Sequence, residues 1–208
     1  MRTDCSTVHR SFHADAPRLP SAFRATAAYA GWERHYVVSP GHALSLIGDK
    51  RIFLTTHGRV EGMRTEEVTL DATFPLDWMS RRVIADVLPR RFRHHDIDGR
   101  DAQRFVDSIA DPEIIQASLY RDACVSSFGS TTIEFAVLTV PTWNARTVSL
   151  TITGQSPYTV RAALNALGAT VGPLAHADMA QWLTAAHHQA YPPKPERSLP
   201  QLHLARTG

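Results

Sequence analysis

Glu33 and His35 stand two positions apart in 32–38, a run of aromatic and β-branched residues that predicts a β-strand. Side chains two positions apart on a strand point to the same face, so this carboxylate and imidazole are expected side by side. His57 follows another predicted strand and can join them from a neighbouring position. Because imidazole titrates near neutral pH, one Glu and two His in a partly dry site suit proton transfer. The sequence therefore predicts Glu33, His35 and His57 as acid/base residues acting on a small organic molecule by cyclisation, isomerisation or elimination.

Short strand-like runs recur between turn signals that contain Gly or Pro, such as 39–41 and 48–49. The predicted strands are 32–38, 43–47, 51–56, 66–70, 114–120, 131–140 and 147–153. Apolar residues at helical spacing predict helices at 76–88, 100–109, 157–167 and 177–187. Antiparallel strands with helices between and after them predict an α+β fold on a closed or strongly curved sheet.

The chain's 208 residues, 43% hydrophobic and 20% charged, fit a single hydrophobic core. Residues 1–27 show little periodicity, and 191–208 contain the Pro-rich stretch YPPKPERSLP. The expected organisation is a flexible N-terminal segment at 1–27, one barrel domain at 28–190, and a Pro-rich C-terminal tail at 191–208.

The charge balance is nearly even, with 22 Lys plus Arg against 20 Asp plus Glu and a net charge of +2. This balance argues against a dedicated nucleic-acid binder.

No apolar stretch approaches the roughly 20 residues of a membrane span, and Cys5 and Cys124 are too few for a disulfide framework. We expect a cytoplasmic protein with a small-molecule partner and neither nucleic acid nor membrane as a partner. The sequence does not indicate an oligomeric state.

Six segments, in chain order, share a further pattern. They read ERHYVV at 33–38, LSLIGDKRIFLTTHG at 44–58, RTEE at 64–67, IIQASLYR at 114–121, IEFAV at 133–137 and LTITG at 150–154. These segments resemble the strand motifs of the CYTH family, the triphosphate tunnel metalloenzymes. The resemblance implies a closed antiparallel β-barrel, or tunnel, whose lining charges hold a triphosphate with Mg²⁺ or Mn²⁺.

In this family register, alternate residues of each strand line the tunnel and are expected to bind substrate. Besides Glu33, His35 and His57, the predicted lining residues are Leu44, Leu46, Thr55, Arg64, Glu66, Leu119, Arg121, Glu134, Ala136, Thr151 and Thr153. Family cations are replaced at Leu44, Leu46, Ala117 and Leu119, and family acids at Gly31, Ala136, Thr151 and Thr153. Each lost charge-assisted contact costs about 1.5–3 kcal/mol, so we expect neither triphosphate hydrolysis nor a bound metal or other cofactor.

Two other functions compete with acid/base catalysis. Glu33, Arg64, Glu66, Arg121 and Glu134 keep the family's charges, which favours a residual Mg²⁺- or Mn²⁺-dependent triphosphatase or a class IV cyclase-like lyase. A non-catalytic scaffold or sensor is the other alternative, and it predicts a barrel filled by its own side chains.

Overall fold

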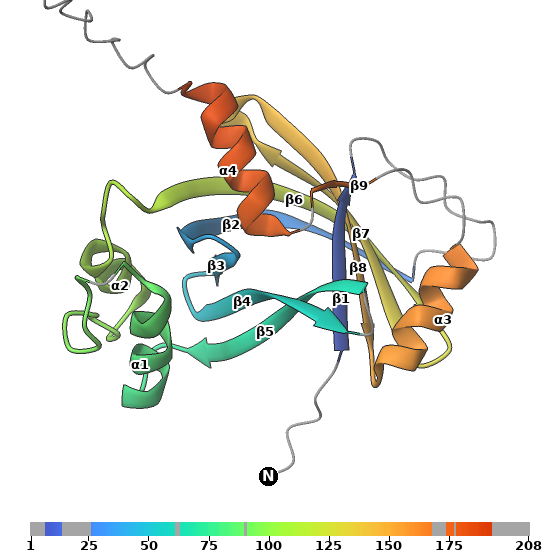
Figure 1. Cartoon of the computed structure of the whole chain (residues 1–208), viewed down its shortest axis with the longest axis horizontal. Helices are drawn as coiled ribbons and strands as arrows, with labels where there is room; N and C mark the ends of the chain where they lie inside the picture. The colour runs from blue at the N-terminus through green and yellow to red at the C-terminus, as the bar shows by residue number, and fades with distance from the viewer. Residues whose placement is uncertain are drawn as a thin grey trace, which may run out of the picture.

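The computed structural model describes residues 7–13, 26–60, 63–89, 91–167, 174–176 and 178–192, although not the side chains of 7, 57–60, 63–67 and 174–176 (Figure 1). Its strands are β1 (Thr7–His13), β2 (Ala27–Ser39), β3 (His42–Ile47), β4 (Arg51–Val60), β5 (Met63–Thr73), β6 (Ile115–Phe128), β7 (Thr131–Val140), β8 (Ala145–Gly154) and β9 (Leu174–His176). Its helices are α1 (Trp78–Val87), α2 (Ala102–Ser108), α3 (Pro157–Leu167) and α4 (Met179–Ala190), with the 3-10 turn η1 (Pro141–Trp143). The α+β class and the predicted strands and helices are confirmed.

All strands belong to one antiparallel sheet in the order β5-β4-β3-β2-β6-β7-β8-β1-β9. The expectation of a closed barrel is wrong, because the sheet curls into a half-barrel that does not close (Figure 1). Strands β5 and β1 approach each other, but no ladder joins them among the described residues. Strand β9 pairs instead with part of the free edge of β1.

The N-terminal segment was expected to be flexible, yet it supplies strand β1. Its residues Thr7–His13 pair with β8 along their whole length. Residues 1–6, 14–25 and 193–208 lie outside the described part of the chain, so the rest of the predicted N-terminal segment and almost all of the predicted tail are not seen.

Helix starts follow from local sequence. Asp77, Asp101 and Asp178 precede α1, α2 and α4, and each carboxylate accepts a hydrogen bond from the backbone N–H three residues later. Asp is a favoured N-cap because its carboxylate satisfies an N–H group that has no partner in the helix.

The helices divide between the two faces of the sheet. Helices α1 and α2 cover the outer face of β2 to β5, and α3 covers the outer face of β7 and β8 (Figure 1). Helix α4 packs on the inner, concave face, where Trp182 and Leu183 contact a cluster that includes Phe12 and Leu119. No helix among the described residues is long and apolar enough to cross a membrane.

Candidate functional site

The inner face collects most of the predicted site residues, because paired residues on neighbouring strands share a face. His35 pairs with Ser45 on β3 and with Ala117 on β6, and Glu33 pairs with Leu119. The same register continues across the sheet and adds further predicted residues to this face. They are Thr55, Arg121, Glu134, Ala136, Thr151 and Thr153.

Leu44 and Leu46 do not line the inner face, contrary to expectation. A register shift between Val37 and Ser39 in the β2–β3 pair places Ser45 opposite His35. A shift of one residue turns every following side chain to the other face. Leu44 and Leu46 are therefore buried on the outer face, in the cluster beneath α1 and α2.

A buried polar network forms the centre of the inner face. Ser45 Oγ lies 2.9 Å from His35 Nδ1, and His35 Nε2 lies 2.9 Å from Glu33 Oε2. On the other side of Glu33, its Oε1 lies 3.1 Å from Arg121 Nε. Arg121 Nη1 in turn donates to Glu134 Oε1 over 2.7 Å, and the Tyr29 hydroxyl donates to Glu134 Oε2. We call these six residues, Ser45, His35, Glu33, Arg121, Glu134 and Tyr29, the polar network.

The protonation states of His35 and Glu33 follow from burial and from their partners. Burial lowers the pKa of His35 below its ordinary value, because the charged imidazolium is disfavoured away from water. Burial alone raises the pKa of Glu33, but the hydrogen bond to His35 and the charge of Arg121 outweigh it, so the net shift is downward. Glu33 is therefore ionised and His35 neutral near pH 7.

These states fix the direction of the hydrogen bonds. An ionised carboxylate can only accept, so His35 Nε2–H donates to Glu33. His35 Nδ1 then carries a lone pair and accepts from the Ser45 hydroxyl. Both ring nitrogens are engaged, so Ser45 ends this hydrogen-bonded chain on the β3 side.

The inner face is sealed at one end and open at the other. Phe12, Ala117 and Leu138 are buried against α4, whereas Tyr29 is exposed and Thr151 half-buried. Gly31, which pairs with Arg121, lies between these ends, and a Cβ built there meets nothing within 4 Å. Open space therefore lies beside the Glu33–Arg121 pair.

The described charges of this face are balanced. Arg10 on β1 donates from Nε to Thr151 Oγ1 over 3.2 Å, and its charge acts on both Glu33 and His35 across the curled sheet. Arg10 and Arg121 together oppose Glu33 and Glu134, so these four side chains have no net charge. Ser149 Oγ, which is buried on this face, has no hydrogen-bond partner among the described residues, whereas Arg121 Nε meets Glu33 as an ion pair. A buried polar atom without a partner costs free energy, and a bound polar molecule can supply that partner.

The other predicted residues have simpler settings. Thr55 Oγ1 donates to the Ala43 carbonyl over 3.3 Å, and Leu119 and Ala136 belong to the apolar cluster under α4. His57 pairs with Glu66 in the β4–β5 ladder, and Arg64 with Arg59. The side chains of His57, Arg64 and Glu66 are outside the described part of the structure, so their predicted roles stay predictions.

Sequence reasoning missed Ser45, Tyr29 and Arg10. Tyr29 is two positions before Gly31 and four before Glu33, so strand alternation alone would have found it. Ser45 depends on the register shift next to the β2–β3 turn, which strand periodicity does not reveal. Arg10 lies in a segment that was expected to be flexible.

The described residues do not fit the Mg²⁺ or Mn²⁺ site of the family. Hard cations need clustered carboxylate oxygens. Glu33 and Glu134 are both paired with the guanidinium of Arg121, which occupies the place between them. Within the described ranges, no group of three His, Cys, Asp or Glu side chains is placed to hold a metal ion.

Comparison with known proteins adds no name to this geometry. No protein-family model matches the sequence, and no curated protein matches it either.

Proposed function

We propose that the inner face binds a small, uncharged or zwitterionic organic molecule and transfers a proton to or from it through Ser45, His35 and Glu33. The observation that carries the proposal is the buried Ser45–His35–Glu33 chain, with two contacts of 2.9 Å. The proposal extends to a distant kinship with the CYTH family and to action in the cytoplasm, both of which rest on the sequence pattern alone.

In the proposed reaction, a proton leaves the bound molecule for Ser45 Oγ as the Ser45 proton moves to His35 Nδ1. The imidazolium that forms is stabilised by the ionised Glu33, which keeps Nε2 protonated throughout. Reversal of these transfers returns the proton to another atom of the molecule. Isomerisation, elimination and cyclisation all need this exchange of protons.

The charge balance supports the substrate class. A triphosphate requires an excess of Lys and Arg, but Arg121 is already paired with Glu33 and Glu134. Polar atoms lie beside apolar side chains such as Leu119 and Ala136, a composition typical of small-molecule sites.

The experiment uses the full chain and a defined library of neutral and zwitterionic hydroxy, carbonyl and amino compounds. Consumption of each compound is followed by liquid chromatography with mass spectrometry, which separates isomers of equal mass, for the wild type and for His35→Gln, Ser45→Ala and Gly31→Leu. We expect His35→Gln and Ser45→Ala to slow turnover by about 100-fold or more. Gly31→Leu should block binding without unfolding, because the new side chain enters open space.

His95→Gln is the matched control, since His95 is exposed and lies between α1 and α2, which cover the outer face. It should leave turnover at the wild-type rate. Turnover by His35→Gln at the wild-type rate would refute the proposal, as would phosphate release from triphosphates that depends on Mg²⁺ or Mn²⁺ and on Glu33.

A further inference from the structure

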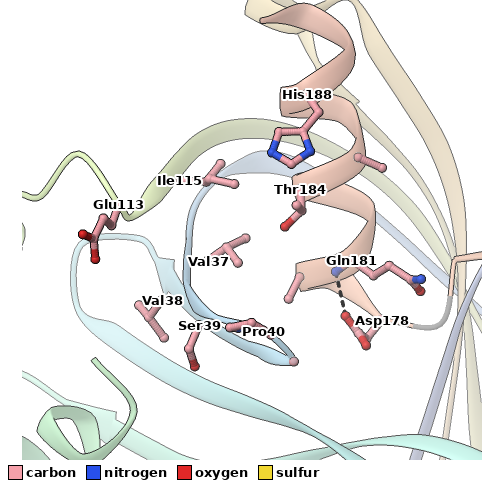
Figure 2. Close-up of a pocket in the computed structure, with 13 residues that line it drawn as sticks. Val37, Val38, Ser39, Pro40, Glu113, Ile115, Asp178, Gln181, Thr184 and His188 are labelled. Carbon is pink, nitrogen blue, oxygen red and sulfur yellow. Dashed lines mark hydrogen bonds between the residues drawn. The ribbon is translucent and has the colours of Figure 1, made fainter. Parts of the chain in front are cut away.

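A cavity lies outside the polar network, between α4 and the turn that joins β2 to β3. Its volume is about 700 Å³, within the usual range of small-molecule sites. Figure 2 shows Val37 and Ile115 on the strand side of this cleft and Thr184 on the facing side of α4. We call it the α4 cleft.

The periodicity of α4 shows which side of the helix packs on the sheet and which side lines the cleft. Met179, Trp182, Leu183 and Ala186 share one side of the helix and are buried against the inner face of the sheet. The residues two positions further along in the same spacing, Gln181, Thr184, Ala185 and His188, line the cleft. One side of α4 therefore packs on the sheet, and another side lines the cleft.

The cleft has an apolar wall and an acidic rim. Val37, Ile115 and Ala185 provide apolar surface. Among the described residues that line the cleft, Glu113 and Asp178 carry negative charge and none is Lys or Arg. Figure 2 places these two carboxylates at opposite ends of it.

Glu113 has a cation beside it that does not cancel the negative charge at this end of the cleft. At the other end, Asp178 accepts a hydrogen bond from the backbone N–H of Gln181. Arg91 Nη1 lies 3.5 Å from Glu113 Oε1, but the same guanidinium also pairs with Asp111. One cation is thus shared by two carboxylates, in a protein whose overall net charge is +2.

We propose that the α4 cleft binds a small amphipathic cation, with an apolar body against Val37 and Ile115 and an ammonium group near Glu113. Opposite charge attracts the ammonium, and the open, acidic end leaves it partly hydrated. This site does not depend on the proton-transfer function proposed above.

Dansylcadaverine is a suitable probe, because it joins a fluorescent aromatic body to a primary ammonium. Titration of the full chain should give saturable binding at one site, with a blue-shifted emission. Its N-acetylated, neutral derivative should bind about tenfold more weakly, the loss of one charge-assisted contact. Glu113→Gln should weaken dansylcadaverine to a similar extent and leave the neutral derivative unchanged.

Ala185→Trp should abolish binding, since Ala185 is exposed at the cleft and a Trp there fills it. Gln189→Trp, on the same helix but not among the lining residues, and Asp122→Asn, an exposed acid elsewhere, should bind as the wild type does. Equal binding of the cationic and neutral probes overturns the ligand class. Unchanged binding by Ala185→Trp overturns the site.

Discussion

Arg121 Nε lies 3.1 Å from Glu33 Oε1 on the neighbouring strand, and less than one-tenth of either side chain is exposed. Glu134 Oε1 lies 2.7 Å from Nη1 of the same guanidinium. A single cation thus bridges two carboxylates on the inner face, and burial makes its removal costly.

Arg121→Met should lower the free energy of unfolding by about 3–5 kcal/mol, because it leaves buried carboxylates unpaired. Urea unfolding at pH 7 measures this loss. Arg51→Met is the matched control, since Arg51 pairs with Asp71 where both side chains are largely exposed. That surface pair should contribute about 1 kcal/mol or less. Equal losses in the two variants would contradict the burial of the polar network.

The stability of the protein should fall as the pH drops below about 6.5, the ordinary pKa of His. Burial lowers the pKa of folded His35, so the unfolded chain takes up this proton first and is favoured as the pH falls. His35→Gln should show a shallower decline in this range, measured by urea unfolding at a series of pH values. His95→Gln should keep the wild-type slope, and an unchanged slope in His35→Gln would show that His35 is not buried as described.

Glu33 should cause a second loss of stability at more acidic pH. The pKa of Glu33 is lowered in the folded protein, so its contribution to stability is present above about pH 4.3 and is lost as the pH falls through the folded pKa. Glu33→Gln should flatten the stability profile below about pH 4.3, and a wild-type profile in this variant would contradict the downward shift.

The neutral His35 ring should carry its proton on Nε2. Long-range ¹H–¹⁵N correlation spectra distinguish the two tautomers directly. Glu33→Gln should weaken this preference, because an amide can donate to Nε2 as well as accept from it. A ring protonated on Nδ1 in the wild type would reverse the proposed direction of proton transfer.

Leu44→Ala should cost about 2–5 kcal/mol of stability, because Leu44 is fully buried beneath α1 and α2. The ¹⁵N signals of the His35 ring should stay in place, since Leu44 lies on the opposite face of the sheet. Ile47→Ala is the control at a more exposed position of the same strand and should cost about 1 kcal/mol or less. A shift of the His35 signals in Leu44→Ala would place Leu44 on the inner face after all.

Strand periodicity predicted most of the sheet, including the shared face of Glu33 and His35. It could not predict which side chains of β3 face the inner side of the sheet, because the register shift beside Ser39 depends on how the turn packs. The register without that shift pairs Leu46, and not Ser45, with His35. The same reasoning missed β1, whose polar sequence is a strand only because β8 provides a complete ladder for it. Local propensity is a weak guide where tertiary pairing decides.

The double role of α4 has an evolutionary consequence. Replacement of Trp182 or Leu183 disturbs the packing against the sheet, and enlargement of Ala185 fills the cleft. Substitutions on two sides of one short helix are therefore selected against for different reasons. If the cleft binds a ligand, homologues that diverge widely elsewhere should retain bulky apolar residues on the sheet-facing side of α4 and small ones on the side that lines the cleft.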